Sequence, residues 1–156
     1  MPTRKIDEDF ELWALMHQTT HTMERARENE IRQFGITMMQ AAVLWGVKSV
    51  EAPATPSKIA RRLLRKPNTV SGLLDRMEKQ GLVKRVKDPN QKTSMRLELT
   101  DVGEEARRRS RREMKVIRRI LSSLSPEERK NLATILHKLR NTSLQELAIM
   151  EEGPFT

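Results

Sequence analysis

The chain has 156 residues and carries 30 Lys and Arg against 21 Asp and Glu, giving a net charge of +9. This length suits one domain, and the positive charge favours a polyanionic partner such as nucleic acid. The absence of cysteine excludes thiolate zinc sites and cysteine nucleophiles and fits a cytoplasmic location. No apolar run approaches the roughly 20 residues that span a bilayer, and the acidic start lacks the apolar segment of a secretory signal.

Two helices are expected at the start of the chain. Residues 8–34 contain no proline or glycine and end at Gly35, which can adopt the left-handed conformation that closes a helix. Thr37 and Gln40 have the spacing of a capping box, so a second helix should begin there and run to about Val50.

Two shorter helices with basic surfaces should follow. Thr55 and Pro56 can cap and start the first, Pro67 can start the second, and Gly81 can end it. The residues expected to face the core are Ile59, Ala60, Leu63 and Leu64 in the first helix and Val70, Leu73, Leu74 and Met77 in the second.

Two strands and two further helices complete the pattern. Residues 82–87 and 95–99 are expected to be strands joined by the turn DPNQKTS. Thr100 should cap a fifth helix with Met114, Ile117, Leu121 and Leu124 on one side, and Ser125 should cap a sixth with an apolar stripe of Leu132, Ile135, Leu136 and Leu139. The predicted fold is therefore mainly α with a small β-wing. It is a winged helix-turn-helix over 37–100 with flanking helices at 8–34 and 101–148, and 1–156 is expected to be a single domain.

The positive charge is concentrated in the predicted helix-turn-helix and wing, where residues 55–100 contain 12 Lys and Arg and 4 Asp and Glu. The helix from Pro67 begins with short polar side chains that can enter a major groove, and the preceding helix and turn supply cations for phosphates. The residues expected at the groove are Asn68, Thr69, Ser71, Gly72 and Arg76. Those expected near phosphates are Ser57, Lys58, Arg65 and Arg85, and Lys92 is expected at the wing tip, near the minor groove.

The segments TPSKIA, NTVSGLLDRMEKQGLVKR and DPNQ through LELTDVG resemble the winged helix of the MarR family of bacterial transcription regulators. The flanking helices also correspond, so the resemblance covers nearly the whole chain. It implies a homodimer held by the first, fifth and sixth helices, in which each recognition helix, residues 67–79, reads half of a palindromic operator. The implied function is a repressor. No cofactor is implied.

Three features depart from the family pattern. Gln91, Lys92 and Thr93 stand where an Asp-Arg-Arg wing tip is common. Lys66 replaces the usual serine cap, and Gly72 replaces a bulkier polar residue that is often arginine. An interior glycine weakens a helix by roughly 0.5 to 1 kcal/mol. We therefore expect Gly72 to let the backbone lie close to the bases and to change the preferred operator.

The resemblance further implies that a small aromatic or anionic effector binds between the dimerisation helices and the winged domain, near Trp13, His17 and Trp45. His17, His21 and Glu24 share one face of the predicted first helix and approximate a metal-binding set. A polar helix surface or a dimer seam is favoured over a metal site for these three residues, since no matching cluster occurs elsewhere.

Two alternatives concern the basic segments. The basic face could bind an acidic protein partner, which would make the protein a winged-helix adaptor. The run RRRSRR at 107–112 is expected to be a solvated helical face rather than a groove contact, and its arginines could alternatively pair with Glu104, Glu105 and Glu113. An enzyme is disfavoured, because the sequence lacks a glycine-rich phosphate loop, an HExxH motif and a recognisable serine nucleophile.

Overall fold

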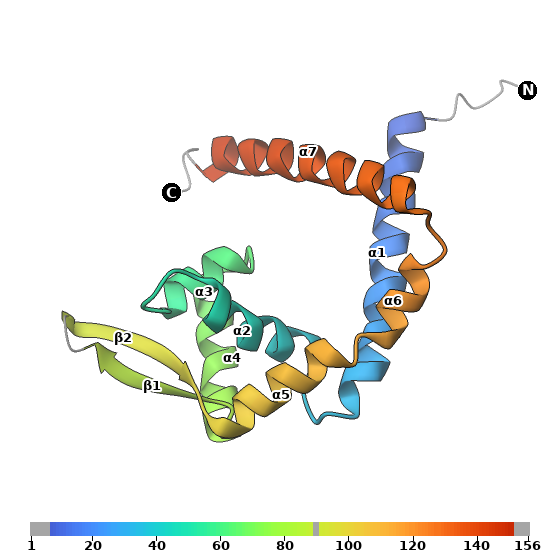
Figure 1. Ribbon diagram of the computed structural model, residues 1–156. Coiled ribbons are helices and arrows are strands. Elements are labelled where there is room, and N and C mark those ends of the chain that lie inside the picture. Colours follow the sequence, from blue (N-terminus) through green and yellow to red (C-terminus); the bar gives the residue numbers. More distant parts are fainter. Residues whose placement is uncertain (1–6, 89–90, 152–156) are drawn as a thin grey trace, which may run out of the picture. The chain divides into compact units, whose positions relative to one another are not determined.

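The computed structural model describes residues 7–88 and 91–151, apart from the side chains of 91–94 and 149–151. The elements follow the order α1 (Glu8–Arg32), α2 (Met38–Ser49), α3 (Pro56–Arg62), α4 (Pro67–Lys79), β1 (Val83–Asp88), β2 (Gln91–Leu99), α5 (Asp101–Arg112), α6 (Lys115–Leu121) and α7 (Pro126–Glu151) (Figure 1). This mainly helical architecture with a two-stranded antiparallel sheet confirms the predicted fold class.

The chain divides into two compact units, one up to Ile117 and one from Arg118 onward. The assignment of 1–156 to a single domain therefore stays a prediction. No helix among the described residues combines the length and apolar character needed to cross a membrane.

Side-chain caps set the starts of the helices. The hydroxyl of Thr37 accepts the N–H of Gln40 at 3.2 Å, and the Gln40 side chain accepts the N–H of Thr37 at 2.9 Å, which is the predicted capping box. Thr55 and Thr100 cap α3 and α5 in the same way, accepting the N–H groups of Lys58 and Gly103. The predicted caps are thus confirmed.

The apolar side of α4 forms the centre of the core. Its four predicted core residues are buried in one cluster with residues of α2, α3 and β1, and the largest fully buried side chains of this cluster include Ile31, Leu44, Ile59, Leu74 and Met77. Gly81 ends α4 with φ +69°, as the sequence predicts.

Leu64 is an exception to the predicted core. Its backbone has φ +51° and its side chain is 62% exposed, so the expectation that it faces the core is wrong. The N–H of Leu64 bonds to the carbonyl of Arg61, and the N–H of Arg65 bonds to that of Ala60. These bonds form the glycine-type end of a helix around a leucine, which turns the side chain outward.

The wing is one antiparallel hairpin that leads away from the end of α4 (Figure 1). Val83 pairs with Leu99 and Lys87 with Met95, and an irregularity in register follows Lys87. The second strand begins at Gln91, four residues earlier than predicted. The predicted turn is therefore too long, because pairing resumes beyond the irregularity.

The predicted fifth helix is two helices. It ends at Arg112, and α6 begins at Lys115, although no proline or glycine marks the break. The cause lies on α1, where Arg27 donates to the carbonyls of Ser110 and Glu113 and Glu30 accepts the N–H groups of Lys115 and Val116. A long-range contact of this kind leaves no local pattern in the sequence.

Candidate nucleic-acid interface

The first turns of α4 present short polar side chains to solvent. Asn68, Thr69 and Ser71 are exposed, and their side chains form no hydrogen bond with another described residue. Lys66 occupies the N-cap position without a side-chain cap, and Pro67 lacks an N–H. The free N–H groups of this first turn can therefore meet an anion such as a phosphate.

Exposed cations lie at the end of α3, in the turn before α4 and in the last turn of α4. Arg61, Arg65, Lys66 and Arg76 are exposed and pair with no carboxylate among the described residues. Ser57 is exposed at the start of α3, and Nζ of the half-buried Lys58 donates to the carbonyl of Glu51 at 2.9 Å. The structure thus gathers the predicted phosphate-binding residues of α3 and its turn beside the predicted recognition helix. Their roles stay predictions.

Arg85 has a different environment from the other predicted phosphate ligands. Its Nη2 lies 2.7 Å from Oδ1 of Asp75, its Nη1 lies 2.9 Å from Oε2 of Glu78, and its guanidinium also donates to the carbonyl of Ser71. The backbone and side-chain hydrogen bonds from Arg85 hold the pKa of Glu78 below its ordinary value, against a smaller opposing effect of burial. Arg85 thereby joins the wing to the exposed side of α4.

This junction was missed by sequence reasoning. Asp75 and Glu78 lie on α4 and Arg85 on β1, so their proximity depends on the tight turn at Gly81. The three-residue spacing of the two acids is the available signal, because it puts both carboxylates on one side of the helix.

The predicted interface also includes Gly72 on α4 and Lys92 on β2. A Cβ built on Gly72 meets no atom within 4 Å, so the space beside this glycine is open. The backbone of Lys92 lies in β2, but its side chain is outside the described residues, and its contact with the minor groove stays a prediction.

Three arginines of the run on α5 pair with nearby acids, which is the alternative that the sequence offers for this run. Arg107 and Arg108 pair with Glu104 and Glu105, and Arg112 lies 3.4 Å from Glu113. Arg109 instead lies over the ring of Phe34, 5.2 Å from its centroid. This part of α5 is therefore mostly committed to contacts within the chain.

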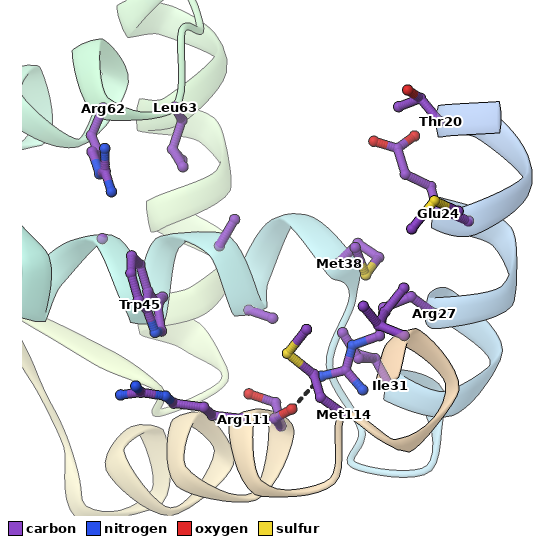
Figure 2. Close-up of a pocket in the computed structure, with 16 residues that line it drawn as sticks. Thr20, Glu24, Arg27, Ile31, Met38, Trp45, Arg62, Leu63, Arg111 and Met114 are labelled. Carbon is purple, nitrogen blue, oxygen red and sulfur yellow. Dashed lines mark hydrogen bonds between the residues drawn. The ribbon is translucent and has the colours of Figure 1, made fainter. Parts of the chain in front are cut away.

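A cavity of about 690 Å³ lies among α1, α2, α3 and α5 (Figure 2). Its wall is mainly apolar, with Met23, Ile31, Met38, Leu63 and Met114 among the residues that form it. Such a pocket with a few polar groups is the usual form of a small-molecule site.

The three predicted effector residues do not converge on this cavity. Trp45 lines it, whereas Trp13 and His17 are not part of its wall. Trp13 lies earlier on α1, is 61% exposed and stacks on His17 with ring centroids 5.7 Å apart. The regular path of α1 carries these two side chains beyond the wall, which begins on this helix at Thr20.

Two cations missed by sequence reasoning accompany Trp45 in the wall. Arg62 of α3 lies over the indole, 5.9 Å from its centroid, and Arg111 of α5 lines the same cavity, where Figure 2 draws it on the other side of Trp45 from Arg62. Neither guanidinium pairs with a carboxylate in the described part of the chain. An aromatic surface between two available cations suits an aromatic anion.

A metal site has no support from the geometry. Across residues 7–88 and 91–151, no three His, Asp or Glu side chains gather closely enough to hold an ion, and this includes the predicted set at His17, His21 and Glu24.

Comparison with known proteins places these features in a family. A model described as the MarR family matches residues 34–92. No curated protein sequence gives a significant match. Among solved structures, the organohalide-sensing transcriptional regulator RdhR-CbdbA1625, bound to 2,4-dichlorophenol, is 28% identical, with a TM-score of 0.81 over 92% of this chain and 87% of that one.

Two further structures were solved with DNA. The MepR–DNA complex of S. aureus is 25% identical, with a TM-score of 0.76 over 87% of this chain and 99% of that one. A cysteine-to-serine mutant of MarR from E. coli, complexed with operator DNA, is 22% identical and shares the fold, with a TM-score of 0.78 over 88% and 99% of the two chains. The family match over residues 34–92 identifies this segment, which contains the helix-turn-helix, as one of the MarR family of transcription regulators, and the flanking helices share the fold of these solved regulators.

Proposed function

We propose that the protein is a cytoplasmic repressor that occupies a palindromic operator as a homodimer and is released by a small aromatic anion. The observation that carries the DNA-binding part is the exposed start of α4, where polar side chains without partners stand among unpaired cations. In a DNA complex, base edges can bond the polar side chains while phosphates pair with the cations.

The homodimer is supported by apolar surface that the described chain leaves uncovered. Phe10, Leu12, Trp13 and Leu15 on α1 are each more than half exposed, and the α7 stripe contains Ile135 at 54% and Leu136 at 48%. Large exposed apolar stripes are rare on monomers and favour burial against another copy. Two-fold symmetry would place two recognition helices about one helical turn, ~34 Å, apart on DNA.

DNA binding is tested by footprinting the full chain on the region upstream of its own gene. The expected result is a protected palindrome whose affinity exceeds that for random duplex and falls steeply with salt. Lys58→Ala should flatten the salt slope by about one, because one phosphate contact is lost. Lys138→Ala, on the exposed part of α7, is the matched control and should leave the slope unchanged.

The adaptor alternative makes the opposite prediction. A basic face that binds an acidic protein would show similar, weak affinity for all duplexes and no discrete footprint. Repression is tested separately by transcription in vitro from the footprinted promoter, where a rise in transcript with added protein would contradict the repressor assignment.

The effector part is supported by the cavity wall around Trp45. The bound 2,4-dichlorophenol of the similar regulator RdhR-CbdbA1625 has the aromatic and acidic character that this wall suits. A ligand releases DNA only when it binds the DNA-free arrangement more tightly than the DNA-bound one. The free energy of that difference sets the size of the response.

Effector binding can be measured with Trp45 as the reporter. The chain has two tryptophans, so Trp13→Phe leaves Trp45 as the source of indole fluorescence. We expect 2,4-dichlorophenolate or benzoate to quench this signal, and Arg62→Gln or Arg111→Gln to weaken the binding. Equal affinity in the variants, or no response of the footprint to saturating ligand, would count against the effector.

A further inference from the structure

The break between α5 and α6 is held by a pair of side chains from another helix. Arg27 and Glu30 are ion-paired on α1, with side chains only 7% and 12% exposed. Arg27 donates to the carbonyls of Ser110 and Glu113 at the end of α5, the latter at 3.2 Å. At the start of α6, Oε1 of Glu30 accepts the N–H of Lys115 at 2.8 Å and that of Val116 at 3.1 Å.

These backbone groups are the ones that a continuous helix would use. In an uninterrupted α-helix the carbonyls of Ser110 and Glu113 accept N–H groups four residues later, and the N–H groups of Lys115 and Val116 donate to carbonyls four residues earlier. The α1 pair therefore replaces hydrogen bonds across the break and satisfies both helix ends. Each charge also has the favourable sign, a cation at a C-terminus and an anion at an N-terminus.

The local sequence favours the continuous form. Between Glu104 and Leu124 there is no proline or glycine, and the apolar spacing alone predicts one helix. Local preference and tertiary contact thus oppose each other at Glu113 and Met114. Opposition of this kind is a requirement for two conformations of similar free energy.

We propose that α5 and α6 form a two-state helix, broken when the Arg27–Glu30 pair caps both ends and continuous when the pair is released. The consequence concerns the cavity, because Arg27, Ser110, Met114 and Ile117 belong to its wall. Straightening the helix moves several of these residues together. Any occupant that contacts them distinguishes the two states and shifts their populations.

The proposal is tested by the backbone conformation of Glu113 and Met114 in the full chain, read from ¹³Cα chemical shifts. Wild-type protein should give non-helical values at both residues, since Glu113 has ψ 38° and α6 starts after Met114. Glu30→Gln and Arg27→Gln should move both residues toward helical values. Glu28→Gln, on the exposed pair with Arg32, is the matched control and should leave them unchanged.

A proline substitution should restore the broken form of the α5–α6 helix. Lys115→Pro fits the first position of α6 but cannot donate the bond that a continuous helix needs. Added to Glu30→Gln, it should restore non-helical shifts at Glu113. If either glutamine variant unfolds, Arg27→Lys replaces it, because lysine keeps the charge but cannot span two carbonyls. Non-helical shifts that persist in every folded Arg27 and Glu30 variant would overturn the proposal.

Discussion

Glu78 holds Arg85 twice, accepting its backbone N–H on Oε1 at 2.9 Å and lying 2.9 Å from its guanidinium Nη1 through Oε2. Asp75 adds a second carboxylate to the same guanidinium. The wing is therefore attached to α4 by charge-assisted bonds at its base, on the exposed side of the helix. A group already shared by two carboxylates is better suited to fixing the angle of the wing than to gripping a phosphate.

Replacing Arg85 should separate these two roles. We expect Arg85→Gln to weaken operator binding about tenfold by loosening the wing, with the salt slope unchanged. Glu78→Gln should act in the same direction, although it removes a negative charge near the DNA. Affinities measured at several salt concentrations decide the matter. A slope reduced by about one in Arg85→Gln would place Arg85 on a phosphate, as the sequence predicts.

Leu64 is a site where substitution should stabilise the protein. A non-glycine residue in the left-handed region costs roughly 1 to 2 kcal/mol, and glycine costs about 0.5 to 1 kcal/mol in unfolded-state entropy. Because the Leu64 side chain is largely exposed, little burial is lost. Leu64→Gly should therefore raise the free energy of unfolding by about 0.5 to 1 kcal/mol, measured by urea denaturation.

Gly81 provides the reverse experiment at the end of α4. It has the same left-handed conformation, with φ +69°. Gly81→Ala should lower stability by about 1 kcal/mol. If both Leu64→Gly and Gly81→Ala are less stable than wild type, the contacts of the Leu64 side chain outweigh its backbone strain.

The local elements could be predicted because their signals are local. Thr37, Thr55 and Thr100 cap helices through bonds to residues three positions on, and the α4 stripe follows from helical periodicity. Leu64 was misassigned because its apolar character favoured burial while the helix end required an outward turn. The positive φ of Leu64 is rare for a leucine, so the residue type gives no signal for this backbone conformation.

The parts that escaped prediction depend on residues distant in sequence. Glu30 contacts Lys115 across 85 positions, and Arg62 and Arg111 line one cavity with Trp45 only because α2, α3 and α5 come together in the fold. Composition identified a basic DNA-binding surface, but it did not distinguish unpaired cations such as Arg65 from the doubly paired Arg85. That distinction requires the positions of the carboxylates.

Acid should weaken the α5–α6 junction through Glu30. Burial raises the pKa of Glu30, but hydrogen bonds from Arg27, Val116 and Lys115 and the charge of Arg27 outweigh it, so the pKa lies below its ordinary value of 4.5. The folded chain then binds fewer protons than the unfolded chain at this group. Its contribution to stability is complete above that ordinary value and is lost as the pH falls through the lower, folded-state pKa.

The measurement compares urea unfolding at neutral pH and at pH values below 4.5, the ordinary value for the group. Glu30→Gln should be less stable than wild type at neutral pH, and the difference should shrink in acid. Glu28→Gln, whose carboxylate is exposed, should lose stability in parallel with wild type. If the difference in stability between wild type and Glu30→Gln stays constant with pH, protonation of Glu30 does not contribute to acid destabilisation.

Gly72 should govern which operator is preferred. The space beside it is open, so larger side chains fit without moving the core. Gly72→Arg should therefore leave the protein folded and change the sequence recovered in a binding selection, because a guanidinium there can reach guanine edges. The test fails if the selected sequence is the same for Gly72→Arg and wild type.

Gly103, by contrast, should not tolerate even one added carbon. A Cβ at this position would lie 1.9 Å from the carbonyl oxygen of Leu82 and 3.4 Å from Cδ2 of Leu44. The same carbonyl accepts the N–H of Thr100 at 3.2 Å, so the start of α5 is docked on the turn that follows α4. Gly103→Ala must break this docking and should lower the free energy of unfolding by about 3 kcal/mol, the upper end of the cost of overpacking.

Gly72→Ala is its matched control within a helix and should instead raise the free energy of unfolding by about 0.5 to 1 kcal/mol. Urea midpoints of the two variants should therefore move in opposite directions, and a shift of both in one direction would show that the contact with Leu82 can relax.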